Sequence, residues 1–225
     1  MNCYHQKEAC NDVRMRRKPN LTARIEQCGS LLVKEPEKMR GDWLTGSGCH
    51  ELRLEIGCGK GRFLVESAKA EPDVLFVGLE KWDNVLVSSL ERAAADGLRN
   101  TRFVCAFAED LTDYFAPGEA SLLYINFCDP WPSDRHAKRR LTGPRFLGLY
   151  SKVLRPGGRI DFKTDNLPLF EFSLNEFEYR GFKLLDVTRD LHKDGPAGVM
   201  TDYELKFYGE GFPIYRCLAE MPLAE

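Results

Sequence analysis

The 225-residue sequence predicts an α/β protein with a doubly wound, Rossmann-like and mostly parallel sheet of about seven strands. Three observations support this fold class. From residue 51 onward, short apolar segments alternate with longer amphipathic ones, which supply the crossovers that parallel neighbours need. A glycine-rich turn follows the first apolar segment. Polar residues suited to chemistry come just after the apolar segments, where open parallel sheets bind their ligands.

Strands are predicted where short apolar runs are bounded by turn residues. In chain order these runs are 51–57, 74–80, 101–108, 121–127, 158–164, 181–188 and 213–221. Amphipathic spacing predicts helices at 62–70, 84–97, 144–154 and 167–179. Gly97 closes the second helix as a carboxyl cap, and a turn at 155–158 leads into the fifth strand.

The length allows one large domain or two small ones, and the chain has 43% hydrophobic residues and a net charge of −2. We expect a single domain at 41–225, after a basic and partly disordered arm or short helix at 1–40. The apolar runs are far shorter than the ~18 residues of a membrane span. The charged N-terminus also lacks the apolar stretch of a signal peptide. A cytoplasmic protein without a membrane partner is therefore expected.

The eight cysteines contain no C-x-x-C pair, and the four histidines are scattered along the chain. This spacing is not that of a zinc site, so no metal is predicted. Most of the cysteines are expected to be free thiols in a reducing compartment.

Basic residues are unevenly distributed along this nearly neutral chain. Residues 14–24 contain five basic side chains and no acid, and residues 134–145 carry a net charge of +4. The rest of the chain then has a net charge of −11. Two basic patches on an acidic body indicate a polyanionic partner bound locally, although such runs also occur as solvated surface.

The first predicted strand ends in a turn with glycines at alternate positions, Gly57, Gly59 and Gly61. Such a turn lets the backbone approach a nucleotide-like ligand closely, although plain tight turns also use glycine. The third glycine comes one residue too early for a dinucleotide fingerprint, and Glu55 would repel a diphosphate. Glu55 would instead attract the ammonium and sulfonium groups of S-adenosylmethionine. Glu80, at the end of the second strand, can accept hydrogen bonds from both ribose hydroxyls.

The fourth predicted strand runs into Asn126 and the segment 127–132, in which two prolines flank a tryptophan. The prolines keep the backbone extended and place Asp129 at the mouth of the cofactor pocket. The basic segment follows at once, so a carboxylate able to read a base lies beside cations able to hold a phosphate backbone. An acid that merely caps a turn is the alternative interpretation of Asp129.

At these residues the chain resembles the bacterial single-subunit tRNA (guanine-N7)-methyltransferases, which are class I S-adenosylmethionine-dependent methyltransferases. The stretches that carry the resemblance are LEIGCGKG, VGLE, NFCDPWP, RHAKRR, FKTDN, MTDYE and GFPIYR. They extend over about residues 50–216, and DPWP followed by RHAKRR is highly specific.

The resemblance implies a role for each matching residue. Glu55 and Gly57 would lie by the methionine part of S-adenosylmethionine with Gly59 in the same turn, Glu80 by its ribose and Ala108 by its adenine. Asn126 and Asp129 would line the gap between cofactor and target base, and Asp129 is the catalytic candidate. The residues implied to hold tRNA are Arg135, His136, Lys138, Arg139 and Arg140, and those implied to complete the guanine pocket are Asp165, Thr201, Asp202, Tyr203 and Glu204.

Two positions depart from the family pattern. Phe107 stands where the family often has an Asp or Asn that binds adenine, and Ser133 stands where a Lys usually follows DPWP. Adenine would then be held by stacking, by backbone contacts or by Glu109, and one phosphate or substrate contact is in question.

The resemblance implies transfer of a methyl group to N7 of the variable-loop guanine in tRNA. N7 has a free lone pair and no proton to lose, so we expect positioning to dominate, with Asp129 stabilising the positive charge that develops on the purine. The alternatives are a nicotinamide-dependent oxidoreductase and an RNA-binding module without catalysis. A monomer and a homodimer are both compatible with the sequence.

Overall fold

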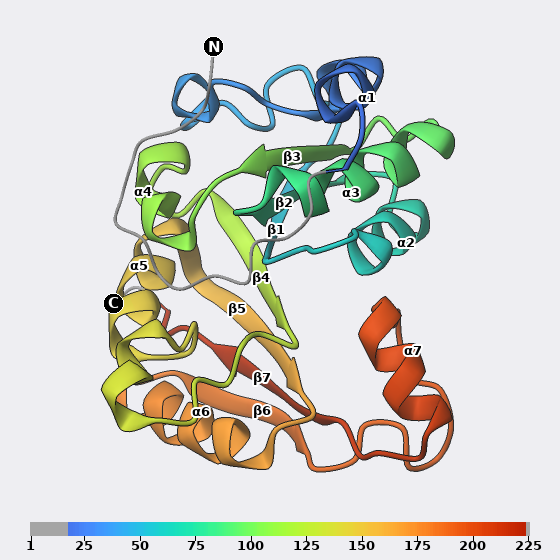
Figure 1. Cartoon of the computed structure of the whole chain (residues 1–225). Helices are drawn as coiled ribbons and strands as arrows, with labels where there is room; N and C mark the ends of the chain where they lie inside the picture. The colour runs from blue at the N-terminus through green and yellow to red at the C-terminus, as the bar shows by residue number, and fades with distance from the viewer. Residues whose placement is uncertain (1–17, 224–225) are drawn as a thin grey trace.

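The computed structural model describes residues 18–223, and every element given below lies within them. Seven strands form one sheet in the order β3-β2-β1-β4-β5-β7-β6 (Figure 1). Their bounds are β1 Glu51–Ile56, β2 Val74–Glu80, β3 Thr101–Cys105, β4 Ala120–Asn126, β5 Leu154–Thr164, β6 Lys183–Thr188 and β7 Tyr215–Glu220. The predicted α/β fold with about seven strands is confirmed.

Five strands of the sheet run parallel to one another. β1 pairs with β2 and β4, β2 pairs with β3, and β4 pairs with β5. β7 runs antiparallel to both of its neighbours, so the last strand of the chain lies between β5 and β6. The sequence predicts a mostly parallel sheet, but it does not reveal this insertion because strand pairing depends on contacts between distant segments.

Helices cover both faces of the sheet (Figure 1). Their bounds are α1 Leu21–Gln27, α2 Arg62–Ala70, α3 Asp83–Ala95, α4 Leu111–Tyr114, α5 Pro144–Val153, α6 Leu167–Tyr179 and α7 Asp202–Gly209. Apolar residues of α2 and α3 form one buried cluster, and those of α5 and α6 form another. Every residue of β2 is buried, as expected for a parallel strand covered on both faces.

Several predicted boundaries differ from the observed ones. β3 ends at Cys105 rather than at 108, because the chain turns into a short 3-10 helix at Ala108–Asp110. β5 begins at Leu154 rather than at 158, since Leu154 pairs with Ala120 before the register shifts. β6 and β7 each begin two residues later than predicted. The helices α4 and α7 are not among the predicted ones.

Residues 18–40 pack against the edge of the sheet and against α3. The backbone N–H of Val33 donates to the carbonyl oxygen of Phe103 at 2.9 Å, which attaches this segment to β3. Arg24 forms an ion pair with Glu91 of α3 at 2.6 Å. The first basic residues of the predicted arm, at 14, 16 and 17, lie outside the described residues.

Within residues 18–223 no helix is both long and apolar enough to cross a membrane. The same part of the chain holds no group of three or more histidine, cysteine or acidic side chains arranged to bind a metal ion. Its cysteines are free thiols, at Cys28, Cys49, Cys58, Cys105, Cys128 and Cys217.

Candidate active site

The glycine turn after β1 has a backbone conformation that other residues rarely adopt. Gly57, Gly59 and Gly61 have positive φ angles of 75°, 58° and 74°. At Gly61 a Cβ atom would lie 2.6 Å from the Cβ of Ser89, so no larger residue fits between the turn and α3. The Ser89 hydroxyl donates to the carbonyl oxygen of Gly59 at 2.7 Å. The turn is therefore packed tightly onto α3 at the carboxyl end of β1.

Glu80, the last residue of β2, faces this turn. Its carboxylate accepts hydrogen bonds from the backbone N–H groups of Gly59 at 3.2 Å and of Trp82 at 3.1 Å. Burial raises the pKa of Glu80, and the two N–H groups oppose that rise. Each carboxylate oxygen can still accept from a further donor, such as a ligand hydroxyl.

A buried carboxylate and a buried amide lie side by side at the carboxyl ends of β1 and β4. Glu55 is 3% exposed, and its Oε1 accepts from Nδ2 of Asn126 at 2.9 Å. The other oxygen of each side chain, Oε2 of Glu55 and Oδ1 of Asn126, is buried and has no hydrogen-bond partner in the described protein. Burial raises the pKa of Glu55 to about 8. Two such acceptors fit a ligand that brings N–H donors and positive charge.

The chain after β4 forms one wall of a cavity of about 170 Å³. Asp129 lies in this wall between two residues with a left-handed backbone, Phe127 at φ 52° and Trp131 at φ 43°. The full lining consists of Phe127, Cys128, Asp129, Pro130, Asp165, Asn166 and Tyr203. The structure thus brings three of the predicted site residues together: Asp129, Asp165 and Tyr203.

The charge of this cavity comes from its carboxylates. Asp129 and Asp165 are both exposed, so a ligand entering from solvent meets them directly. Burial, with a smaller effect of neighbouring Asp129, raises the pKa of Cys128 to about 12. The Cys128 thiol therefore stays protonated near neutral pH and does not supply a thiolate nucleophile.

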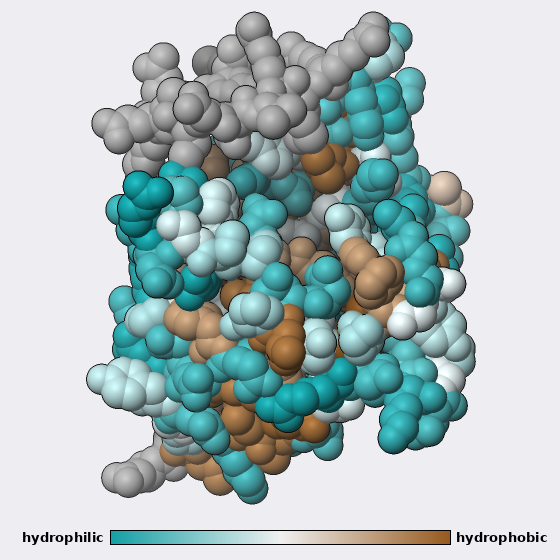
Figure 2. Space-filling model, turned by 60° about the horizontal axis from the view of Figure 1, so that its bottom comes forward, coloured by the Kyte–Doolittle hydropathy of each residue, from teal (hydrophilic) through white to brown (hydrophobic). Residues whose placement is uncertain are grey.

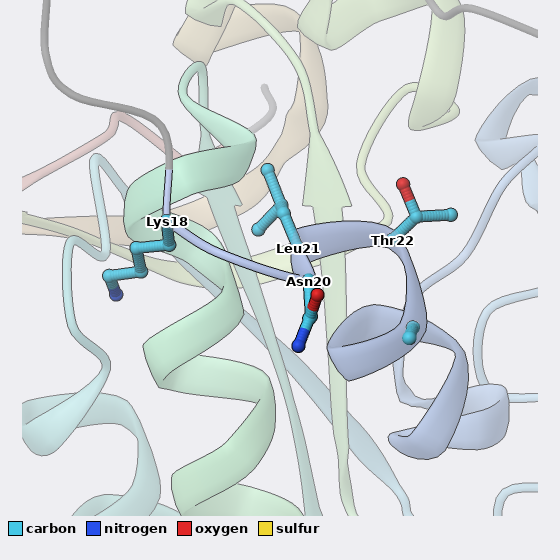
Figure 3. A pocket seen from close by; sticks show the side chains of 5 residues that line it. Lys18, Asn20, Leu21 and Thr22 are labelled. Carbon is cyan, nitrogen blue, oxygen red and sulfur yellow. The ribbon is translucent and has the colours of Figure 1, made fainter.

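A larger cavity of about 420 Å³ lies at the start of α1 (Figure 3). Its lining residues are Lys18, Asn20, Leu21, Thr22 and Ala23. The Lys18 ammonium donates to Oγ of Ser88 on α3 at 2.5 Å, so this cation is already engaged. In Figure 1, α1 lies at the top of the view beside α3, above the carboxyl ends of β4 and β5. Because doubly wound sheets bind ligands at those ends, we place the active site at the smaller cavity.

Of residues 201–204, Tyr203 lines the cavity while the other three face elsewhere. Oγ1 of Thr201 accepts from the backbone N–H of Glu204 at 2.9 Å, and the Glu204 carboxylate accepts from that of Thr201 at 3.2 Å. This reciprocal pair is a capping box that begins α7. The Asp202 carboxylate forms ion pairs with Arg92 of α3 at 3.2 Å and with Arg62 of α2 at 3.9 Å. Successive helical residues point about 100° apart, so these side chains cannot share one direction.

Glu204 is fully buried in a cluster that we call the buried clasp, formed by Lys163, Glu204 and His192. The Glu204 carboxylate accepts from Nζ of Lys163 at 2.7 Å and pairs with Nε2 of His192 at 2.9 Å. Lys163 also donates to the carbonyl oxygen of Val199 at 3.1 Å. The backbone N–H of Ala197 donates to Nδ1 of His192 at 3.1 Å, so we assign the ring proton to Nε2. The buried clasp connects β5, the loop after β6, and α7.

The basic segment next to the cavity forms a 3-10 helix, Asp134–Arg139, in which the cations differ in exposure. Arg135, His136 and Lys138 are exposed and can reach a ligand in solvent. The Arg139 guanidinium lies 4.7 Å from the ring centre of Trp131. The exposed members are therefore better placed than Arg139 to contact a phosphate backbone.

Arg140 faces the protein rather than solvent. Its side chain is 11% exposed, and its guanidinium donates to the carbonyl oxygens of Pro130 and Trp131 at 3.1 to 3.3 Å. It also lies 4.5 Å from the ring centre of Phe172 on α6. Arg140 thus braces the wall that carries Asp129, in a geometry different from the tRNA contact that the sequence implies.

The residues predicted near adenine follow β2 and β3. The backbone N–H of Ala106 donates to the carbonyl oxygen of Glu80 at 3.1 Å, so the two strand ends are adjacent. Ala108 begins the 3-10 helix after β3, and the preceding Phe107 is 51% exposed. Trp82, which follows β2, is 37% exposed. Two exposed rings at these ends offer surface for stacking, which stays one of the three predicted ways to hold adenine, beside backbone contacts and Glu109.

Sequence reasoning missed Lys163, His192 and the helix α7. A signal for α7 was present, because Thr201 and Glu204 have the spacing of a capping box. A lysine inside the apolar run of β5 also indicates a buried ion pair, since lysine is rarely buried without a partner. No comparable signal selects His192, which lies in an irregular loop.

The fold is shared with solved methyltransferase structures. The 16S rRNA methyltransferase KamB has a TM-score of 0.60 at 19% identity and covers 78% of this chain and 90% of that chain. A 16S rRNA (adenine(1408)-N(1))-methyltransferase from Catenulisporales acidiphilia, determined with its cosubstrate SAM, has a TM-score of 0.59 at 15% identity and covers 81% and 91%. This chain therefore shares its Rossmann-like α/β fold with both of these methyltransferases.

Sequence similarity is more specific. A family model described as "Putative methyltransferase" matches residues 50–217. The tRNA (guanine-N(7)-)-methyltransferase of Geobacillus kaustophilus is 46% identical over 212 residues, which are 93% of this chain and 98% of that protein. The protein of the same name from Halalkalibacterium halodurans is 44% identical over 210 residues, 92% of this chain and 96% of that protein. The chain belongs to the tRNA (guanine-N(7)-)-methyltransferase family, which confirms the resemblance.

Proposed function

We propose that this chain transfers a methyl group from S-adenosylmethionine to N7 of a guanine in tRNA. The observation that supports this function most is that a buried acceptor pair and a cavity lie next to each other at the carboxyl ends of the strands. We call Glu55, Asn126 and Glu80 the cradle, and Asn126 is followed directly by Phe127, which lines the cavity. A cradle for a cationic ligand therefore meets a cavity lined by carboxylates.

The residues of the cradle fit S-adenosylmethionine. Oε2 of Glu55 and Oδ1 of Asn126 lack partners and would accept from its ammonium group. Glu80 would accept from its ribose hydroxyls, with its orientation held by the N–H groups of Gly59 and Trp82. When bound, S-adenosylmethionine supplies the methyl group on a positively charged sulfur.

We expect the binding of S-adenosylmethionine at pH 7 to release close to one proton from Glu55. The free carboxyl has a pKa of about 8 because it is buried, and it is therefore mostly protonated at pH 7. A cationic ligand favours the charged form, so the proton leaves on binding and affinity rises with pH up to about 8. Calorimetry at pH 7 in two buffers of different ionisation enthalpy measures this release.

Glu55→Gln is the control for that measurement. The variant keeps the shape of the side chain and cannot ionise, so its binding should be weaker and should release no proton from this position. The same proton count in the variant and the wild type would show that Glu55 does not titrate with the ligand.

The chemistry asked of the protein is mainly positioning. Guanine N7 already carries an in-plane lone pair, so no side chain has to remove a proton before the transfer. Positive charge develops on the purine during the reaction, and the Asp129 carboxylate at the cavity wall stabilises it. Arg140 supports Asp129 indirectly, by holding the carbonyl oxygens of the two residues that follow it.

Carboxylates in the cavity also favour guanine over adenine. Guanine presents N1–H and an exocyclic amine as donors, whereas adenine presents an acceptor at N1. Asp129 and Asp165 are acceptors when ionised, so they match the N1–H and exocyclic amine of guanine, whereas N1 of adenine would place an acceptor against a carboxylate. Tyr203 supplies a ring beside them.

The RNA must present its guanine outside a regular helix. The major groove of A-form RNA is deep and narrow, so N7 is reached in a loop or on a base turned out of the stack. The exposed cations Arg135 and Lys138 lie beside the cavity wall and would hold the flanking backbone.

We expect Arg135→Ala combined with Lys138→Ala to raise KM for tRNA and to flatten its dependence on salt. Each lost phosphate contact should lower the slope of log Kd against log salt concentration by about 0.7 to 0.9. Filter binding between 50 and 300 mM salt measures the slope. The control is Arg180→Ala with Lys183→Ala, which removes the same charge from two exposed positions. Arg180 follows α6 and Lys183 begins β6, and this variant should leave the slope unchanged.

The direct test of the function is incubation with unmodified tRNA and labelled S-adenosylmethionine, followed by nucleoside analysis. The expected product is 7-methylguanosine. Label in another nucleoside would change the substrate assignment. Tight tRNA binding without any transfer would favour an RNA-binding module, and binding of NADH without S-adenosylmethionine would favour an oxidoreductase.

A further inference from the structure

A row of four aromatic rings leads from the cavity out along α7. The rings of Phe127 and Tyr203 lie 6.1 Å apart between centres, those of Tyr203 and Phe207 5.2 Å, and those of Phe207 and Phe212 5.7 Å. Phe127 and Tyr203 line the cavity. We call the outer part, Tyr203, Phe207 and Phe212, the aromatic ridge.

The aromatic ridge is open to solvent at both of its ends. Tyr203 is 60% exposed and Phe212 is 54% exposed. Large rings are normally buried, so two that are more than half exposed and joined through a third indicate a contact surface. Figure 2 shows one face of the molecule on which hydrophobic residues are exposed in patches among hydrophilic ones.

Local backbone geometry explains where these rings lie. Tyr203 and Phe207 are four residues apart on α7, so they share one face of the helix. Gly211 has a φ of 75°, and the backbone N–H of Phe212 donates to the carbonyl oxygen of Phe207 at 3.0 Å. This is the pattern of a Schellman cap, which normally brings two apolar side chains together. The cap accounts for the contact between Phe207 and Phe212, and it leaves the exposure of Phe212 unexplained.

We propose that the aromatic ridge stacks the nucleotides that flank the target guanine. The proposal rests on the proposed function, because it takes tRNA as the ligand. A guanine drawn into the cavity leaves its neighbours without a stacking partner, and aromatic side chains replace that partner for any base. The ridge begins inside the cavity, so the flanking nucleotides reach it without a gap. Lys206 is 67% exposed, with its ammonium 5.9 Å from the Phe207 ring centre and 3.9 Å from the carboxylate of Glu210, and it adds a cation for the backbone.

The test compares the affinity of the full chain for unmodified tRNA in three forms: wild type, Phe212→Leu and Tyr179→Leu. Leucine keeps the apolar contact of the helix cap and removes the ring, so folding should be preserved. Tyr179 is 85% exposed at the end of α6 and is the matched control. We expect Phe212→Leu to weaken binding by roughly 5- to 100-fold and Tyr179→Leu to leave it unchanged.

Salt dependence separates stacking from charge. Phe212→Leu should weaken binding by the same factor at low and at high salt, since no phosphate contact is lost. A tRNA with an abasic site beside the target guanine should bind the wild type more weakly than intact tRNA does. Phe212→Leu should bind this abasic tRNA with the same affinity as the wild type, because the ring and the missing base would have formed one contact.

Three results would overturn the proposal. The first is that Phe212→Leu binds tRNA like the wild type while the wild type methylates it. The second is that the losses from the variant and from the abasic site are additive. The third is that Phe212→Leu changes the sedimentation coefficient but not tRNA binding, which would make the ridge a contact between copies of the chain. A wild type that binds tRNA but does not methylate it would instead contradict the proposed function.

Discussion

Replacing Asp129 with asparagine is expected to lower kcat for methyl transfer by about 100- to 1,000-fold, which is the usual effect of removing one preorganised electrostatic contact in a transition state. The expectation follows from the position of Asp129 in the lining of the cavity, which it shares with Asp165 and Tyr203. Asparagine keeps the size of the side chain and removes the charge that would stabilise the developing cation. Single-turnover methylation of saturating tRNA measures the step directly.

Binding of tRNA should persist in Asp129→Asn, because the exposed cations of the 3-10 helix are untouched. Asp73→Asn is the matched control. Asp73 is exposed directly before β2, at the opposite end of that strand from Glu80, so the variant should retain wild-type kcat. A wild-type rate for Asp129→Asn, with an unchanged melting temperature, would remove Asp129 from the mechanism.

Replacing Lys163 with methionine is expected to lower the free energy of unfolding by about 3 to 5 kcal/mol. Lys163 is 4% exposed, and its ammonium is 2.7 Å from the fully buried carboxylate of Glu204. Methionine would leave that carboxylate buried without the ammonium that neutralises its charge. Urea unfolding followed by circular dichroism measures the loss, and slower methyl transfer should accompany it because the same contact positions α7 and Tyr203.

Two further variants test whether the burial of the pair causes this effect. Arg189→Met removes an exposed ion pair with Glu171 of the same 2.7 Å length and should cost less than about 1 kcal/mol. Adding Glu204→Gln to Lys163→Met should recover part of the lost stability, since the unpaired charge is then gone. Equal effects of Lys163→Met and Arg189→Met would show that the buried clasp does not stabilise the fold.

The catalytic wall and the buried clasp differ in how far the sequence predicts them. Asp129 follows an apolar strand and is followed by prolines at 130 and 132, so its place at the sheet edge can be inferred from neighbours within a few residues. Glu204 carries a strong local signal as a capping residue of α7, and that signal says nothing about its ion pair. Lys163 and Glu204 are 41 residues apart, and only the packed position of α7 brings them together.

The basic segment after the cavity wall also shows what the sequence cannot predict. Its charge predicts an anionic partner, and Arg135 and Lys138 are exposed as that interpretation requires. Arg140 has the same charge but donates to the carbonyl oxygens of Pro130 and Trp131. Charge alone does not distinguish the two environments, because exposure depends on how the 3-10 helix lies against Phe172 and α6.

The sequence by itself determined the alternation of strands and helices, the glycine turn after β1 and the acidic residue after β4. These features depend on backbone preference and on the spacing of apolar residues, which act over short distances along the chain. Tertiary structure alone decided that β7 lies between β5 and β6, that Glu204 faces Lys163 and that the aromatic ridge stays exposed. These arrangements join segments far apart in the sequence, and the partner of each side chain is chosen by packing and by the cost of burying polar groups unpaired.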